Sequence, residues 1–190
     1  SSLGNDYDVI DFLGSGYSFY QTGIDGCFIG DNTTGSRYGL NAVTFDTSAA
    51  GTQFVRPYIR RSYIQQNSSA PTGYGLVFYN NGTLNPVDGT HNATVCEDSI
   101  VYGGMSFNGV GDSIVLRNCL STGQNMVYVN LVNAAGGMAG NFVFDGGPIS
   151  NAGGLRIDCA ASAQIINVEA EQNLTTTSET ASLYDIAGAV

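Results

Sequence analysis

Residues 114–119 read IVLRNC, residues 142–147 read FVFDGG, and residues 165–170 read IINVEA. Each stretch is an apolar run of strand length, and successive stretches begin 28 and 23 residues apart. A second series with a similar spacing is interleaved with the first: residues 99–104 (SIVYGG), 126–131 (MVYVNL), 155–159 (LRIDC) and 182–186 (SLYDI). Two interleaved series with a shared period of about 25 residues are typical of a solenoid of short stacked strands.

The composition favours strands over helices. The chain has 26 glycines and 20 Tyr and Phe residues, and no window offers strong helix formers at a helical period. We therefore expect an all-β fold, a parallel β-helix with a coil period of about 25 residues. An antiparallel sandwich is the main alternative, but it would break the alignment of the two series. A propeller would need a blade repeat of about 40–45 residues, which we do not find.

Side chains on stacked strands should alternate between the core and the solvent, and equivalent positions of successive coils should lie above one another. The residues expected to point inward are Ile114, Leu116, Phe142, Phe144, Ile166 and Val168. The residues expected to point outward and to stack are Arg117, Asp145 and Glu169.

The earlier part of the chain follows the same plan less regularly. Residues 26–31, 41–46, 54–59 and 75–79 are strand-length runs bounded by Gly, Asn, Ser or Pro. Residues 1–24 are aromatic but do not keep the period, so they form either an irregular first coil or a segment that covers the end. We expect a single domain overall, with the parallel β-helix spanning residues 25–190.

Charge and cysteine usage exclude several classes of function. The net charge is −10, and all six basic residues are arginines, so the net field would repel nucleic acid or an acidic membrane surface. No apolar run is long enough to cross a membrane. The spacing of Cys27, Cys96, Cys119 and Cys159 fits neither a zinc site nor a redox motif, and we expect them to be small buried residues rather than disulfides. With a single histidine, His91, neither a Ser-His-Asp triad nor a metal site is predicted, and no cofactor is expected.

Several phrases carry a resemblance to a known superfamily: residues 25–30 (DGCFIG), 61–67 (RSYIQQN), 116–120 (LRNCL) and 165–172 (IINVEAEQ). They look like coils of the pectate-lyase-like right-handed parallel β-helices, and the last is similar to coils of bacteriophage tailspikes and capsule depolymerases. The resemblance covers residues 24–190 and is one of pattern. It implies a homotrimer, attached to a virion tail with other tail proteins, that binds and often cleaves host-surface polysaccharide.

If the chain is an enzyme, its chemistry would rest on carboxylates. Vertical neighbours in a stack meet the separation of about 5 Å that a retaining glycosidase requires. Asp145 with Glu169 is the predicted catalytic pair, and Asp158 with Asp185 is a second possibility. The alternative is a solvated face on which Arg117 balances Asp145.

A carbohydrate-binding role is predicted for Arg60, Tyr63 and Arg117, because arginine forks suit carboxylates and sugar hydroxyls while tyrosine faces stack on sugar rings. A lyase would need a basic residue as its base, and only arginine is present. The resemblance implies a tailspike or tail-fibre segment that recognises host-surface glycan, located on the virion or outside the cell. A secreted polysaccharide hydrolase or lyase (a depolymerase) and a purely structural extracellular solenoid are the alternatives.

Overall fold

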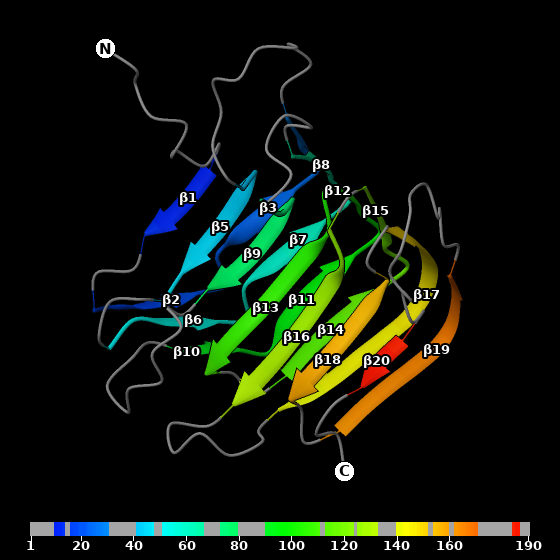
Figure 1. The fold of residues 1–190 in the computed structure, drawn as a ribbon. Coiled ribbons are helices and arrows are strands. Elements are labelled where there is room, and N and C mark those ends of the chain that lie inside the picture. Colours follow the sequence, from blue (N-terminus) through cyan, green and yellow to red (C-terminus); the bar gives the residue numbers. More distant parts are fainter. Residues whose placement is uncertain are drawn as a thin grey trace, which may run out of the picture.

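The computed structural model describes residues 10–13, 16–30, 41–47, 51–66, 73–79, 90–110, 113–123, 125–132, 140–151, 154–159, 162–170 and 184–186. These residues form twenty strands joined by turns, and none of them is helical. Every strand pairing within them is parallel, which confirms the all-β, parallel prediction. Figure 1 shows the chain advancing steadily across the sheets from its N-terminal to its C-terminal strands.

A seven-stranded sheet forms one side of the molecule (Figure 1). In spatial order its strands are β1 (Ile10–Leu13), β5 (Val43–Asp46), β9 (Leu76–Tyr79), β13 (Met105–Val110), β16 (Val127–Val132), β18 (Leu155–Cys159) and β20 (Tyr184–Ile186).

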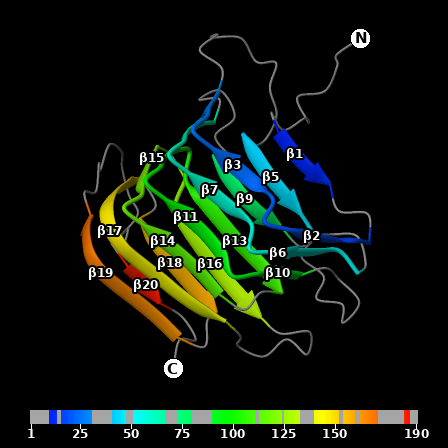
Figure 2. The same ribbon diagram turned by 180° about the vertical axis from the view of Figure 1, so that it is seen from behind.

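A ten-stranded sheet forms the opposite side, as the reverse view shows (Figure 2). It has two limbs. The first limb consists of β3 (Gly23–Asp25), β7 (Tyr58–Arg60), β11 (Thr94–Glu97) and β14 (Ser113–Arg117). The second limb consists of β4 (Phe28–Ile29), β8 (Tyr63–Gln65), β12 (Ile100–Tyr102) and β15 (Leu120–Gly123). Both limbs reach β17 (Asn141–Asn151), a long curled strand that also pairs with β19 (Ser162–Ala170). A three-stranded sheet completes the set with β2 (Ser18–Tyr20), β6 (Gln53–Val55) and β10 (Thr90–Asn92).

The core is built by stacking equivalent side chains of successive strands. Phe12, Phe45, Phe78 and Phe107 form one column, with successive ring centroids 4.4, 4.4 and 5.6 Å apart. Such offset stacks add to the stabilisation that burial alone provides. The column runs across β1, β5, β9 and β13 of the seven-stranded sheet. Aromatic residues from distant segments of the chain therefore pack in the same core.

A sharp corner separates the two limbs of the ten-stranded sheet. The corner residues Gly26, Arg61, Asp98, Asn118 and Gly146 all have positive φ. The backbone N–H groups of the first four donate to carbonyls on the following strand, as from Asp98 to Arg117 (3.0 Å) and from Asn118 to Asp145 (2.8 Å). Gly, Asp and Asn tolerate this left-handed conformation best, which explains four of the five residue choices.

The predicted inward positions are correct for Ile114, Leu116, Phe142 and Phe144, whose side chains are fully buried. Val168 is partly buried against the same core. The prediction for Ile166 is wrong, because its side chain is 41% exposed. Ile165 is the residue opposite Phe144, because Ala163 continues the column of Ile114 and Phe142 and fixes the alternation along β19.

One pairing in the predicted second series is also wrong. Residues 100–102 belong to the ten-stranded sheet, and Met105–Val110 is the segment that pairs with Val127–Val132. Gly103 and Gly104, both with positive φ, turn the chain between the two sheets. The offsets between paired strands are not uniform: Val43 follows its partner Ile10 by 33 residues, whereas Leu120 follows Ile100 by 20.

Candidate functional site

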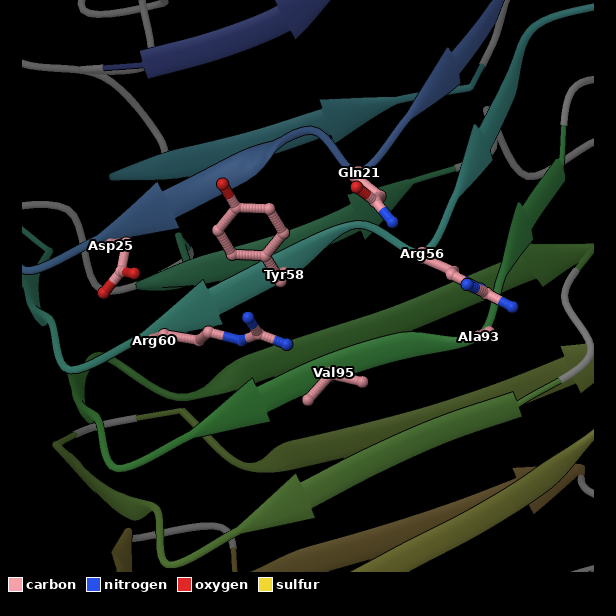
Figure 3. Close-up of a pocket in the computed structure, with 7 residues that line it drawn as sticks. All are labelled: Gln21, Asp25, Arg56, Tyr58, Arg60, Ala93 and Val95. Carbon is pink, nitrogen blue, oxygen red and sulfur yellow. The ribbon is translucent and has the colours of Figure 1, made fainter.

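A recess of about 470 Å³ lies on the outer face of the first limb (Figure 3). A volume of this size falls in the range of small-ligand sites. The recess crosses the outer surfaces of β3, β7 and β11 and the turns that precede them. Its lining residues are Gln21, Asp25, Arg56, Tyr58, Arg60, Ala93 and Val95.

The turn before each of these strands holds a residue in the left-handed conformation. Gln21, Arg56 and Ala93 have φ angles of 52°, 56° and 53°, and they follow one another in the stack. The N–H of Gln21 donates to the carbonyl of Val55 at 2.9 Å, which ties the first turn to the second. The side chains of Gln21 and Arg56 thereby lie at the same end of the recess (Figure 3).

Tyr58 lies in the middle of the recess, between Gln21 and Arg56 at one end and Asp25 and Arg60 at the other (Figure 3). Its partner in the register is Gly23. A Cβ atom at Gly23 would lie 1.9 Å from the Tyr58 carbonyl oxygen and 2.8 Å from the first ring carbon, so a larger residue would not leave room for this approach. The Arg60 guanidinium lies 4.9 Å from the ring centroid, which is a cation–π distance.

A column of alternating charge runs beside the recess. Asp25, Arg60, Glu97, Arg117 and Asp145 are register partners on successive strands of the ten-stranded sheet. Glu97 accepts from Arg60 at 2.8 Å and lies 3.6 Å from Arg117. Opposite charges thus alternate where like charges would repel one another.

Asp25 has a second arginine partner at the corner. The Nε and NH2 groups of Arg61 donate to its two carboxylate oxygens at 2.8 and 2.6 Å. The Arg61 guanidinium therefore lowers the pKa of Asp25, first through the hydrogen bonds and then through its charge. A carboxyl group held in its ionised form suits hydrogen-bond acceptance from a ligand hydroxyl and does not suit proton donation.

The predicted catalytic pair does not stack. Asp145 lies between Arg117 and Ile166 in the register, whereas Glu169 is opposite Pro148. The reason is the corner: Asp145 precedes the turn at Gly146, and Glu169 follows the equivalent turn at Asn167, which has a φ of 53°. The two carboxyls therefore belong to strand segments on different sides of that corner.

Of the three predicted carbohydrate-binding residues, Arg60 and Arg117 meet at Glu97, whereas Tyr63 lies apart from them. Arg60 lines the recess. Tyr63 lies beyond the corner on the second limb, where its ring stacks on Phe28 at 5.1 Å. Arg117 lies on β14 and contacts Glu97. Sequence reasoning missed Gln21, Arg56 and Tyr58. A usable signal was present in residues 55–63, VRPYIRRSY, where two arginines flank a tyrosine within one short coil.

A second polar group lies on the outer face of the seven-stranded sheet. The Tyr128 hydroxyl donates to Asp158 at 2.9 Å and Arg156 donates to the other carboxylate oxygen at 2.7 Å. Burial and the neighbouring carboxylate raise the pKa of Tyr128 to about 12. The predicted partner of Asp158, Asp185, is opposite Arg156 in the backbone register. Asp158 is thus held by a tyrosine and an arginine.

Comparisons with known proteins leave the family open: no family model, curated protein or solved structure matches the chain significantly. Within the described residues, no cluster of three or more His, Cys, Asp and Glu side chains could hold a metal ion. The same residues contain no helix of the length and apolarity needed to span a membrane.

Proposed function

We propose that the chain is a stretch of right-handed parallel β-helix that binds an oligosaccharide, as a segment of a tailspike or tail fibre does. The support for the fold is the register. Each sheet pairs strands in a regular cycle through the chain, and equivalent corners such as Arg61, Asp98 and Asn118 recur between the same two limbs. A coil that returns to the same sheet after each turn accounts for all three sheets at once.

The single observation that carries the binding role is the recess around Tyr58. An aromatic ring held between arginine forks and a carboxylate is a common arrangement for a sugar ring, because the ring face packs on the sugar's C–H groups while charged groups bond its hydroxyls. Gln21 and Asp25 supply the amide and carboxylate hydrogen-bonding groups at opposite ends.

The geometry favours binding over hydrolysis. On the described outer face of the first limb, Asp25 is neutralised by Arg61, and Glu97 by Arg60 and Arg117. A glycosidase needs one carboxyl group that holds its proton near neutral pH, and arginine neighbours oppose this. The first-limb face is thus suited to recognising a glycan chain and holding it in place.

The test is a screen of immobilised bacterial-surface and other glycans, followed by titration calorimetry with the glycan that binds. We expect Tyr58→Ala to weaken binding by about fivefold to 150-fold, because one ring contact contributes roughly 1–3 kcal/mol. Tyr102→Ala, which removes a partly exposed tyrosine from the second limb, is the matched control and should bind as the unmodified protein does.

Two results would reject the proposal: a screen in which no glycan binds, or a bound glycan whose affinity is the same for Tyr58→Ala and the unmodified chain. Circular dichroism of each variant separates a lost contact from a lost fold.

A further inference from the structure

We infer that the ligand of this recess is an acidic saccharide, one that carries a carboxylate or a sulfate ester, and that Arg56 recognises the acidic group. The inference rests on the proposed function, because it names the class of glycan that the same site takes. It depends on which arginines of the described chain form ion pairs.

Arg56 differs from the other arginines of the described chain. Five arginines lie in that part of the chain, and four of them form ion pairs with Asp or Glu: Arg60, Arg61, Arg117 and Arg156. Arg56 makes no ion pair with any described residue and its side chain is exposed. An unpaired guanidinium is conspicuous in a chain that has 16 acidic and only six basic residues.

Arg56 also lies at a strained position of the backbone. Its φ of 56° is a left-handed conformation that costs free energy for any residue with a Cβ atom. The corner between the limbs mostly meets this cost with Gly, Asp or Asn, and its exception, Arg61, binds Asp25. Gln21 and Ala93 take the same conformation in the equivalent turns of the stack, and Arg56 is the one of these three with a charged side chain, which forms no ion pair with a described residue.

The local charge of the recess favours an anion. Among the charged groups that line the recess, Arg60 is paired with Glu97 and Asp25 with Arg61, so Arg56 contributes the positive charge that no described carboxylate balances. Figure 3 shows Arg56 at the end of the recess opposite Asp25, with Tyr58 between them. A sugar ring on Tyr58 can therefore place its acidic group at Arg56 and its hydroxyls at Asp25. The planar fork of arginine binds carboxylate and sulfate oxygens through two parallel hydrogen bonds.

The experiment compares acidic and neutral forms of the same glycans. The probes are tetrasaccharides of hyaluronan and chondroitin sulfate, their carboxyl-reduced and desulfated counterparts, and an array that holds both acidic and neutral bacterial glycans. We expect the bound glycans to be acidic, with affinity at least about tenfold above that of the neutralised form. Arg56→Gln should remove most of this difference, and Arg56→Lys should retain part of it. Arg156→Gln, a charge-matched change on the seven-stranded sheet, should leave it intact.

The other outcomes separate this inference from the proposed function. If acidic and neutral forms bind equally and Tyr58→Ala abolishes both, the acidic class is wrong and the glycan-binding role stands. If the acidic preference survives Arg56→Gln, the assignment to Arg56 is wrong. If nothing on the array binds, both proposals are rejected.

Discussion

Gly146 and Gly147 follow one another in β17, both with positive φ (73° and 102°), yet their surroundings differ. A Cβ atom at Gly146 would have no neighbour closer than 3.8 Å, whereas one at Gly147 would lie 2.1 Å from the Cys119 carbonyl oxygen. We expect Gly146→Ala to lower the free energy of unfolding by about 1–2 kcal/mol, the cost of a left-handed alanine. Gly147→Ala should cost about 3–5 kcal/mol, because strain and backbone overlap add together.

Urea denaturation of the two glycine variants measures this difference directly. Equal losses in the two variants would mean that the close approach of β17 to the preceding coil does not constrain the chain, and would contradict the register at this corner.

Thr44 is a second residue whose environment predicts a change in the free energy of unfolding. Its hydroxyl oxygen is buried and has no hydrogen-bond partner in the described structure. Thr44→Val replaces the hydroxyl by a methyl group of similar size, and it should raise the free energy of unfolding by about 1 kcal/mol.

Thr52 is the matched control for Thr44. It is also buried, but its hydroxyl accepts a hydrogen bond from the Gly16 N–H at 3.0 Å. Thr52→Val should therefore lower the free energy of unfolding by about 1–3 kcal/mol, since the amide loses its partner. A loss of stability in both variants would show that Thr44 has a partner after all. Thermal melts followed by circular dichroism measure both changes.

At the scale of the element, a column of hydroxyl and thiol side chains reinforces the corner between the two limbs. The residues after the first four corners are Cys27, Ser62, Ser99 and Cys119, and each donates to the carbonyl two residues earlier, at 3.3, 2.6, 2.8 and 3.3 Å. The Oγ of Ser99 also accepts from the Ser62 N–H at 3.1 Å, so the bonds link one coil to the next.

Ser99→Ala should lower the free energy of unfolding by about 1–3 kcal/mol, because it removes two hydrogen bonds at a buried position. Ser99→Cys should lose less, since the thiol of Cys119 already fills the equivalent place on the next coil. Urea denaturation of the two variants gives the ranking, and the opposite order would show that the size of the side chain matters more than its hydrogen bonds.

The strands themselves could be predicted, because alternation of side chains is local. Burial follows from a period of two along β14, which carries Ile114 and Leu116, and along the first part of β17, which carries Phe142 and Phe144. The register could not be predicted past a corner. Asn167 occupies one left-handed position, and counting along the strand without it misplaced both Ile166 and Glu169.

The site was less accessible to prediction than the fold. Arg60 was identified because it lies in a dense basic and aromatic stretch. Gln21 and Arg56 reach the same recess only because left-handed turns 35 residues apart lie on successive coils, as the hydrogen bond from Gln21 to Val55 shows. That juxtaposition depends on coil length, which varies along the chain and which no local pattern specifies.

At the scale of the whole molecule, an apolar stripe lies on the outer surface of the second limb. Phe28, Tyr63, Ile100 and Leu120 are register partners on four successive strands. Phe28 and Ile100 are 63% and 39% exposed, and the Phe28 ring stacks on Tyr63. Exposed apolar side chains that adjoin one another on neighbouring strands are a feature of protein interfaces.

The sequence predicts a parallel homotrimer, and this stripe is the surface that we expect copies of the chain to share. Columns packed around a common threefold axis would each bury the same face against a neighbour.

Light scattering at micromolar concentration should then give three times the chain mass of 19.8 kDa. Replacing Phe28 and Ile100 together by serine should shift the mass toward that of one chain. Tyr20→Ser, at a tyrosine that is 70% exposed outside the stripe, should not shift it. A single-chain mass for the unmodified protein, or a trimer that tolerates the double change, would contradict this interface, since burying the exposed apolar side chains is the interaction on which the trimer depends.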